Sequence, residues 1–304
     1  MKIKLYNEEI NIRTHYCQLN DCQASCVEEP YVNLYVKFTG CNAKCPFCID
    51  DCLQRHFDTD KLKEILETIQ EKVKIRKVSF TGGEPTLDID RLEKSFALVK
   101  QYSPDTFTVI NTNGYNLKGI FNSNILKNVD SVSLSRHHYS NKRNDEIFGS
   151  SVPWDSEIAE LTQDEGTAKK MHFSCNLIKG YIDNLGKIEN YLEHANALRV
   201  HDVGFVSLMP LNKYCKNNST PFIDGGRLMK MKEWNYKTCC ECANYLYLSK
   251  KFYGETVKVY HRNPKSPMDF ENMLMYDGAI LRVGFNGKIL TMSDTMAWTT
   301  HQNV

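Results

Sequence analysis

The sequence lacks an excess of charge of either sign, with 38 Lys and Arg against 37 Asp and Glu in 304 residues. It has no basic domain and no charged tail, so we expect no nucleic-acid partner. It also lacks any run approaching ~18 consecutive apolar residues, the length that a membrane-spanning helix requires. The first residues, MKIKLYNEEINIR, contain no apolar signal segment. These absences predict a cytoplasmic protein without a membrane span.

Cysteine is too sparse for a disulfide scaffold, because 12 of 304 residues falls well below the ~8–10% typical of that class. In a reducing compartment, clustered cysteines more often bind metal or do chemistry. No low-complexity tract and no repeat of solenoid period is present. The chain is 41% hydrophobic, and its length suffices for one α/β barrel of ~250 residues with an appended region.

Short segments rich in β-forming residues alternate with segments of helical periodicity. Strands are expected at 31–38, 76–80, 106–110, 129–135, 170–178 and 202–208, with helices at 59–73, 89–102 and about 184–197. This alternation predicts an α/β fold, a partial (β/α)6 barrel of parallel strands. In such barrels the carboxyl ends of the strands form the active site.

The barrel is expected to occupy residues 31–210, after a cysteine-bearing N-terminal extension at 1–30. Residues 211–304 are interpreted as a smaller C-terminal region with a possible auxiliary metal site. Within it, 211–227 is expected to be a loop, and 255–260 and 279–292 are expected to be strands. Asn286-Gly287 indicates a hairpin turn inside the last segment.

Three cysteines follow the first predicted strand in a C-x3-C-x2-C pattern: Cys41, Cys45 and Cys48. Thiolates are the usual ligands of cubane iron–sulfur clusters. Three of them on one loop would bind three irons and leave the fourth open, as catalytic metal sites do. The alternative is a structural zinc site whose fourth ligand is Cys52 or His56.

This spacing, with an aromatic residue (Phe47) just before the third cysteine, resembles the signature of the radical S-adenosylmethionine superfamily. The resemblance implies that Cys41, Cys45 and Cys48 bind a [4Fe-4S] cluster. It also implies that S-adenosylmethionine chelates the open iron through its amino and carboxylate groups. The backbone of Phe47 would lie near the adenine; packing in the core is the simpler interpretation of this side chain.

The second predicted strand is followed by Gly82-Gly83-Glu84-Pro85, which matches the GGEP motif of the same family. Two glycines allow close backbone approach and positive φ. By resemblance, the backbone carbonyls and Glu84 would receive the methionine ammonium group. A pair of glycines alone would indicate only a turn, but this pair follows the cysteine motif by one βα unit.

Weaker matches follow the next strands, and ordinary strand-end polarity is the alternative for each. Arg136 would bind the methionine carboxylate bidentately. The other positions would contact the ribose, the carboxylate or the rest of the cofactor: Asn111, Asn113, Ser133, Ser135 and Asn176.

The resemblance implies that the reduced cluster cleaves S-adenosylmethionine to a 5′-deoxyadenosyl radical. This radical would abstract hydrogen from a C–H bond of a peptide or small-molecule substrate. A flavodoxin or ferredoxin-type reductant would supply the electron, and the enzyme would be oxygen-sensitive. The competing hypothesis is a non-catalytic zinc or iron–sulfur protein that binds metal or transfers electrons.

Further cysteines resemble, loosely, those of molybdenum-cofactor-cyclase-like enzymes that carry an auxiliary [4Fe-4S] cluster. The candidate ligands are Cys17, Cys22, Cys26, Cys215, Cys239, Cys240 and Cys242, and half-buried free thiols are the alternative. Cys175 is expected to pack in the core, or else to donate hydrogen to a substrate radical. His137 is a candidate acid or base, or a surface loop residue.

Overall fold

The computed structural model describes the chain except residues 13, 18–25, 51, 52, 54, 221–234, 239–244, 253–254, 263–271, 285–286 and 293–304. Its centre is a curved sheet in which six parallel strands are neighbours in chain order. They are β5 (Tyr31–Phe38), β6 (Lys74–Gly82), β7 (Phe107–Thr112), β8 (Ser131–Ser135), β9 (Met171–Leu177) and β10 (Asp202–Ser207). The partial (β/α)6 barrel is therefore confirmed.

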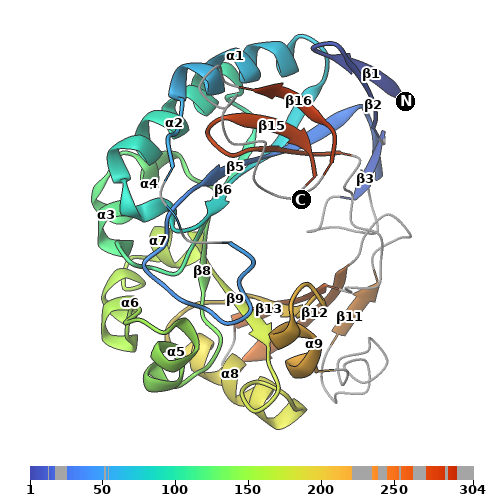
Figure 1. Cartoon of the computed structure of the whole chain (residues 1–304). Coiled ribbons are helices and arrows are strands. Elements are labelled where there is room, and N and C mark those ends of the chain that lie inside the picture. Colours follow the sequence, from blue (N-terminus) through green and yellow to red (C-terminus); the bar gives the residue numbers. More distant parts are fainter. Residues whose placement is uncertain are drawn as a thin grey trace.

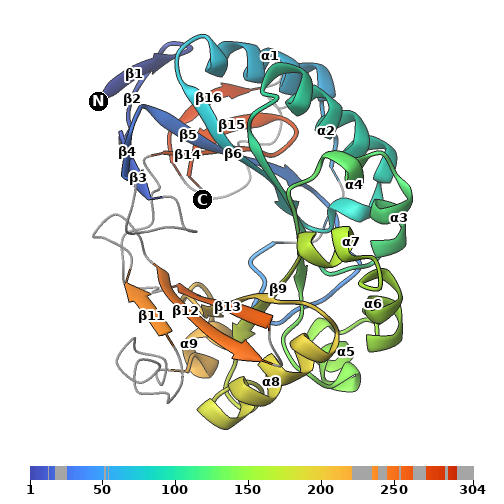
Figure 2. The same cartoon turned by 180° about the vertical axis from the view of Figure 1, so that it is seen from behind.

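Helices cover the outer side of this curved sheet (Figures 1 and 2). They are α1 (Thr59–Gln70), η1 (Pro85–Leu87), α2 (Ile89–Tyr102), α3 (Leu117–Asn122), α4 (Ile125–Asn128), α5 (Asn141–Phe148), α6 (Asp155–Leu161), α7 (Glu165–Lys170) and α8 (Leu185–Ala197). None of the helices in the described part of the chain has the length and apolar character needed to cross a bilayer.

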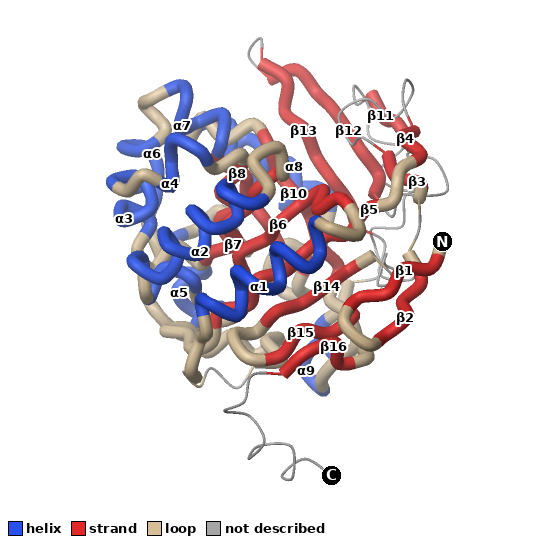
Figure 3. The backbone as a smooth tube through the Cα atoms, turned by 90° about the horizontal axis from the view of Figure 1, so that it is seen from above, coloured by secondary structure: helices blue, strands red, loops and turns tan. Residues whose placement is uncertain are grey.

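The first two long helices follow from apolar residues at helical spacing. In α1, the buried residues are Leu62, Ile65, Leu66 and Ile69, which form one stripe against the sheet. Asp58 begins this helix by accepting a hydrogen bond from the Lys61 backbone N–H at 2.8 Å. Figure 3 shows α1 and α2 lying side by side across the strands.

Alternation along the strands separates a helix-facing side from a barrel-facing side. On β8, Val132 and Leu134 belong to the main hydrophobic core, under the helices. Because successive side chains point to opposite faces, Ser131, Ser133 and Ser135 face the barrel interior. Small polar residues thus replace the bulky branched residues that usually fill a closed barrel, and they line the interior with hydrogen-bonding groups.

The region after residue 210 extends the same sheet at both of its edges. β13 (Glu255–Arg262) pairs in parallel with β10, and β14 (Met273–Tyr276) pairs in parallel with β5. The outer strands are antiparallel: β11 (Asn235–Thr238), β12 (Tyr245–Phe252), β15 (Ile280–Val283) and β16 (Ile289–Met292). The β15–β16 pair confirms the expected hairpin, while Asn286 lies outside the described residues.

One expectation for this region was wrong. Within the supposed loop at 211–227, the structure contains the short helix α9 (Lys213–Asn218). Asn212 begins it by accepting a hydrogen bond from the Cys215 backbone N–H at 2.8 Å. Only Cys215 is buried in this helix, so no apolar period marks it in the sequence.

The N-terminal extension forms two small antiparallel hairpins. β1 (Lys2–Leu5) pairs with β2 (Glu8–Asn11), and β3 (His15–Cys17) pairs with β4 (Cys26–Glu28). Ile3, Leu5 and Ile10 join the main hydrophobic core. The first hairpin is therefore part of the packed body of the protein.

Candidate functional site at the carboxyl end of the barrel

The three motif cysteines lie on one loop, which we call the cysteine loop (residues 39–48), directly after β5. Cys41 and Cys45 are half-buried and Cys48 is exposed. Backbone N–H groups point at two of the sulfurs: Ala43 donates to Cys41 Sγ and Asp50 donates to Cys48 Sγ, both at 3.4 Å. Such donors stabilise negative charge on sulfur, as thiolate ligation of metal requires.

The two glycines at the end of β6, Gly82 and Gly83, let the backbone approach the end of β5 and the cysteine loop closely. The N–H of Gly83 donates to Phe38 O, and that of Glu84 donates to Gly40 O, both at 2.8 Å. A Cβ on Gly83 would lie 1.8 Å from Gly40 O, and one on Gly82 would lie 2.1 Å from Phe38 O. Gly82 also has a φ of 112°. Glycine is required here by contact between two loops of the chain.

Glu84 is buried and holds loops together, while its expected contact with a methionine ammonium stays a prediction. Its Oε1 accepts from the Thr86 N–H at 3.0 Å and from the hydroxyls of Thr86 at 2.7 Å and Thr112 at 2.6 Å. Its Oε2 accepts from the Asn113 N–H at 2.6 Å. Burial raises the pKa of Glu84, and these bonds oppose that rise. Both carboxylate oxygens therefore have donors inside the protein, while Pro85 simply begins η1.

Asn113, which was expected near the cofactor, directly contacts the cysteine loop. Its Nδ2 donates to Asn42 Oδ1 at 2.9 Å and lies 3.8 Å from Cys41 Sγ. Its backbone N–H is the one bound to Glu84. Asn113 therefore connects the end of β7 to the first cysteine, a position from which hydrogen bonding to the sulfur tunes a bound metal.

An aromatic stack supports the other end of the cysteine loop. The His137 ring stacks on Phe148 at 4.9 Å between centroids and meets Phe47 edge-on at 5.1 Å. The Lys44 N–H donates to Phe148 O at 2.7 Å. Phe47 thus packs against protein groups, as the simpler interpretation held. His137 lies beneath the loop and is only 3% exposed.

His137 is neutral in this environment. Its Nδ1 accepts a hydrogen bond from the Asn176 backbone N–H at 3.0 Å, which places the ring proton on Nε2. Burial lowers the pKa of His137 from 6.5 to about 3. The structure therefore gives this residue a packing role, and an acid–base role at neutral pH does not fit it.

The buried imidazole predicts a loss of stability in mild acid. Below pH 6.5 His137 binds a proton in the unfolded chain but not in the folded chain. The free energy of unfolding therefore decreases as the pH is lowered. From pH 7 to pH 5 the expected loss from this residue is about 2 kcal/mol. Urea unfolding of the wild type and of His137→Gln at pH 7, 6 and 5 measures it. Between pH 7 and pH 5 the free energy of unfolding of the variant should fall by about 2 kcal/mol less than that of the wild type. The same pH dependence in both proteins would contradict a neutral, buried His137.

Four of the expected cofactor contacts share the barrel interior. Ser133 and Ser135 alternate with the core residues of β8, and Asn176 alternates with those of β9. Asn111 pairs in register with Ser133 across β7 and β8, and its Nδ2 lies 3.5 Å from Phe80 O. The structure brings these residues to one face near the cysteine loop. Their contact with a cofactor stays a prediction.

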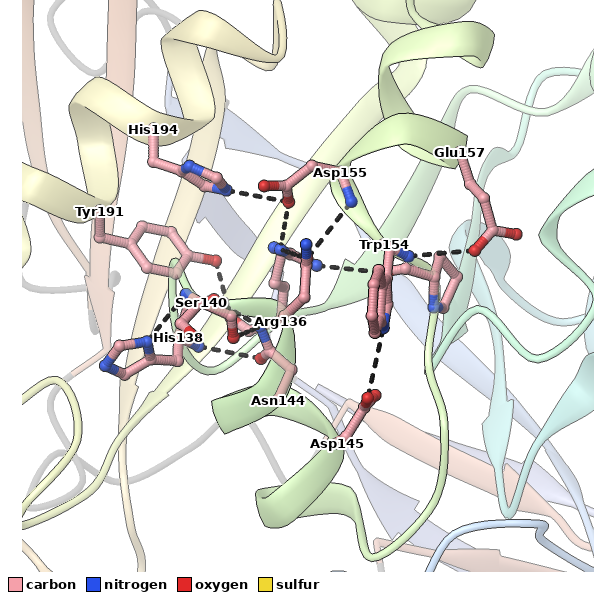
Figure 4. A network of polar contacts seen from close by, with 12 residues as sticks. Arg136, His138, Ser140, Asn144, Asp145, Trp154, Asp155, Glu157, Tyr191 and His194 are labelled. Carbon is pink, nitrogen blue, oxygen red and sulfur yellow. Dashed lines mark hydrogen bonds and ion pairs between the residues drawn. The ribbon is translucent and has the colours of Figure 1, made fainter.

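Arg136 has a different partner from the expected carboxylate of a cofactor. Its side chain, 2% exposed, forms an ion pair with Asp155 and donates to Pro153 O at 3.1 Å and to Asn141 Oδ1 at 2.6 Å. Figure 4 shows it at the centre of a polar network that also includes Tyr191 and His194 of α8. This guanidinium therefore joins the segment after β8 to α6.

Cys175 points away from the barrel interior. It is fully buried in the main core, beside Tyr191, and its Sγ donates to Asn176 O at 3.6 Å. Burial raises the pKa of this thiol well above its ordinary value. The structure thus places Cys175 among core residues, on the face of β9 opposite the barrel interior, where the packing interpretation expects it.

Cys215 lies next to the cysteine loop, a proximity that the sequence did not suggest. It is 2% exposed, and its Sγ donates to Phe47 O at 3.5 Å. Cys22, Cys239, Cys240 and Cys242 lie outside the described residues, as do the side chains of Cys17 and Cys26, which are paired in register. An auxiliary cluster and its ligands, Cys215 included, thus stay predictions.

The cysteine loop has the donor set that a cluster held by three thiolates would use. Among the residues the structure places, no three or more His, Cys, Asp or Glu side chains gather where one metal ion would bind. A zinc ion needs every sulfur at ~2.3 Å from one point, whereas each thiolate of a cubane binds a different iron. Three accessible thiols on one loop, with N–H donors aimed at two of them, fit that arrangement.

Comparison with known proteins agrees with this geometry. Residues 35–167 match the family model described as the Radical SAM superfamily. The chain is 34% identical over 113 residues to a Thermococcus kodakarensis protein named "Probable GTP 3′,8-cyclase" and 25% identical over 182 residues to the GTP 3′,8-cyclase of Aquifex aeolicus. These matches span 36% and 54% of this chain.

The same matches span 36% and 57% of those relatives, less than two thirds of either. A solved structure, Streptococcus suis SuiB bound to the precursor peptide SuiA, is 20% identical, with a TM-score of 0.49. That match covers 61% of this chain and 41% of SuiB.

The fold and the cysteine loop define a domain of the kind found in radical SAM enzymes. The matched segment contains the cysteine loop, the glycine pair and the strands β6 to β8. Residues 35–167 therefore match a Radical SAM domain, in agreement with the resemblance to that superfamily in the sequence.

Proposed function

We propose that this chain binds a [4Fe-4S] cluster through Cys41, Cys45 and Cys48 and cleaves S-adenosylmethionine reductively at its open iron. The observation that supports this most is a pair of backbone hydrogen bonds of 2.8 Å, from the Gly83 N–H to Phe38 O at the end of β5 and from the Glu84 N–H to Gly40 O in the cysteine loop. This contact unites two signature motifs in one rigid unit at the carboxyl ends of adjacent strands. When bound, the cluster and S-adenosylmethionine would supply a 5′-deoxyadenosyl radical that abstracts hydrogen from a substrate C–H bond.

The residues of the chain would position the reactants and exclude water. The cysteine loop would hold the cluster, supported by the stacked rings of His137 and Phe148, against which Phe47 of the loop packs. The inward side chains of Asn111, Ser133, Ser135 and Asn176 would bind polar groups of the cofactor. The backbone carbonyls around Gly82 and Gly83, together with Glu84, would receive its ammonium.

The substrate would be a peptide or a small molecule that enters the polar interior of the barrel. Two curated relatives are named for a cyclase that acts on GTP, which supports the small-molecule class. A flavodoxin or ferredoxin-type reductant would supply the electron, in the cytoplasm. Residues 31–210 would carry this chemistry, with 1–30 and 211–304 as its extensions.

Product analysis tests this proposal. The chain is purified and reconstituted without oxygen, reduced with dithionite, and incubated with S-adenosylmethionine. We expect about four irons and four sulfides per chain and the formation of 5′-deoxyadenosine and methionine. Zinc in place of iron and sulfide would favour the non-catalytic alternative, and a loaded cluster that yields no 5′-deoxyadenosine would overturn the proposed activity.

A further inference from the structure

We propose that Asn212 is a positioning residue for Cys48, the third predicted ligand of the cluster. The inference rests on the proposed function for the identity of the group that Cys48 binds. Asn212 lies outside the segment that matches the family model, 45 residues beyond its end at residue 167. No motif in the sequence connects it with the cysteine loop, and its role follows only from contacts in the folded chain.

The side-chain amide of Asn212 forms hydrogen bonds through both its oxygen and its nitrogen. The Oδ1 of Asn212 accepts the Cys215 N–H at 2.8 Å and so caps α9. The Nδ2 of the same amide lies 3.2 Å from Pro46 O and 3.4 Å from Cys48 O, and donates to both. Because the cap fixes the orientation of the amide, the donor is directed at the backbone that carries the third cysteine.

A second contact from the same helix supports the same stretch of backbone. Cys215 Sγ donates to Phe47 O at 3.5 Å. Asn212 and Cys215 together therefore contact three consecutive carbonyl groups, those of Pro46, Phe47 and Cys48. We call this pair of residues with α9 the α9 clamp. Cys215 also packs with Ile147, Ile178 and Leu208 in a small core of its own, with the Phe47 ring against it.

The α9 clamp is itself attached to the sheet. Ser219 forms an isolated bridge with Ile178, and the Lys179 N–H donates to Asn218 O at 2.9 Å. Ile178 and Lys179 directly follow β9. The α9 clamp therefore connects the segment after β9 with the cysteine loop after β5.

The three cysteines differ in how the protein supports them. Cys41 has the Asn113 side chain and the Ala43 N–H beside its sulfur. Cys48 is the exposed one, and Asn212 donates to its carbonyl from a distant part of the chain. Removing that donor should therefore loosen the cluster at the Cys48 corner without disturbing the Cys41 corner.

The matched test exchanges the amide for a hydroxyl at two helix caps. Ser caps helices about as well as Asn, so Asn212→Ser keeps the cap of α9 but loses both donors to the cysteine loop. Asn184→Ser makes the same exchange at α8, where Asn184 Oδ1 accepts the Lys187 N–H at 3.0 Å. The control therefore reports any general cost of the substitution.

The readout is the rate at which an iron chelator removes iron from the reconstituted protein, measured anaerobically with thermal unfolding recorded alongside. Asn212→Ser should lose iron about two- to tenfold faster than the wild type, the effect of one or two hydrogen bonds. Asn184→Ser should match the wild type. Equal rates for Asn212→Ser and the wild type overturn the inference, and so does an equal acceleration in the control.

The outcomes separate this inference from the proposed function. A wild-type protein that assembles no cluster refutes both. A wild-type protein that holds a cluster but yields no 5′-deoxyadenosine refutes only the activity, because chelation rates still test the positioning role. Normal activity with unchanged rates in Asn212→Ser refutes only the role of Asn212.

Discussion

Replacing any one of Cys41, Cys45 and Cys48 with alanine is expected to abolish formation of 5′-deoxyadenosine and to remove most of the iron. Each would bind a different corner of the cube, so none can substitute for another. Loss of groups that merely support metal ligands costs 10- to 100-fold in affinity or activity in general, so losing a ligand should cost more than about 100-fold. Iron and sulfide analysis after anaerobic reconstitution measures the first effect, and product chromatography measures the second.

Cys175→Ser provides the control for these variants. Cys175 is buried in the main core, and its thiol donates to Asn176 O, a bond that a hydroxyl can also make. We expect this variant to retain the iron content and the activity of the wild type, with a small loss of stability. If an alanine at Cys41, Cys45 or Cys48 left both quantities unchanged, the cysteine loop would not be the cluster site.

Gly83→Ala is expected to destabilise the protein by roughly 3 kcal/mol or more, among the largest effects of a single methyl group. The new Cβ would lie 1.8 Å from Gly40 O, and neither atom is the end of a flexible side chain. The loops must separate, which also breaks the bonds from Gly83 N to Phe38 O and from Glu84 N to Gly40 O. Urea unfolding of the chain without cluster measures the loss.

Gly186→Ala is the matched control for this steric argument. Gly186 lies in α8, and the nearest atom to a Cβ there, Asn184 Oδ1, would be 3.5 Å away. Alanine has a higher helix propensity than glycine, so this variant should be as stable as the wild type or slightly more so. Equal stability of Gly83→Ala and Gly186→Ala would show that the two loops are not in contact as described.

The strands and long helices of the barrel could be predicted because local signals and tertiary structure agree there. The segment at 31–38 matches β5, and that at 89–102 matches α2. In both, apolar residues recur at the period of the element and the buried side chains follow that period. The cysteine motif was equally easy to recognise, since its three cysteines lie within a segment of eight residues.

The α9 clamp could not be predicted, because its contacts join residues far apart in the chain. Asn212 and Cys48 are separated by 164 positions, and no local pattern records such a pairing. Asn212 could have been recognised as a helix cap, but nothing local indicates what its amide donates to. The contact of Cys215 with Phe47 O could not be predicted for the same reason, because 168 positions separate the two residues.

Glu84 and Arg136 show a different limit of sequence analysis. Both stand at positions where charged side chains would suit a charged ligand, and both instead have partners inside the protein. A motif reports which residue is present, while burial and hydrogen bonding determine what that residue binds. At Glu84 four hydrogen bonds to neighbouring groups hold the carboxylate, and at Arg136 the partner is Asp155.

The central claim is that the cysteine loop leaves one iron open for S-adenosylmethionine. Electron–nuclear double resonance of the anaerobically reduced protein tests it most directly, using S-adenosylmethionine isotopically labelled at its methionine amino nitrogen. We predict a hyperfine coupling between that nitrogen and the cluster, lost in the Cys48→Ala protein. A reduced cluster whose spectrum is the same with and without S-adenosylmethionine would contradict the account.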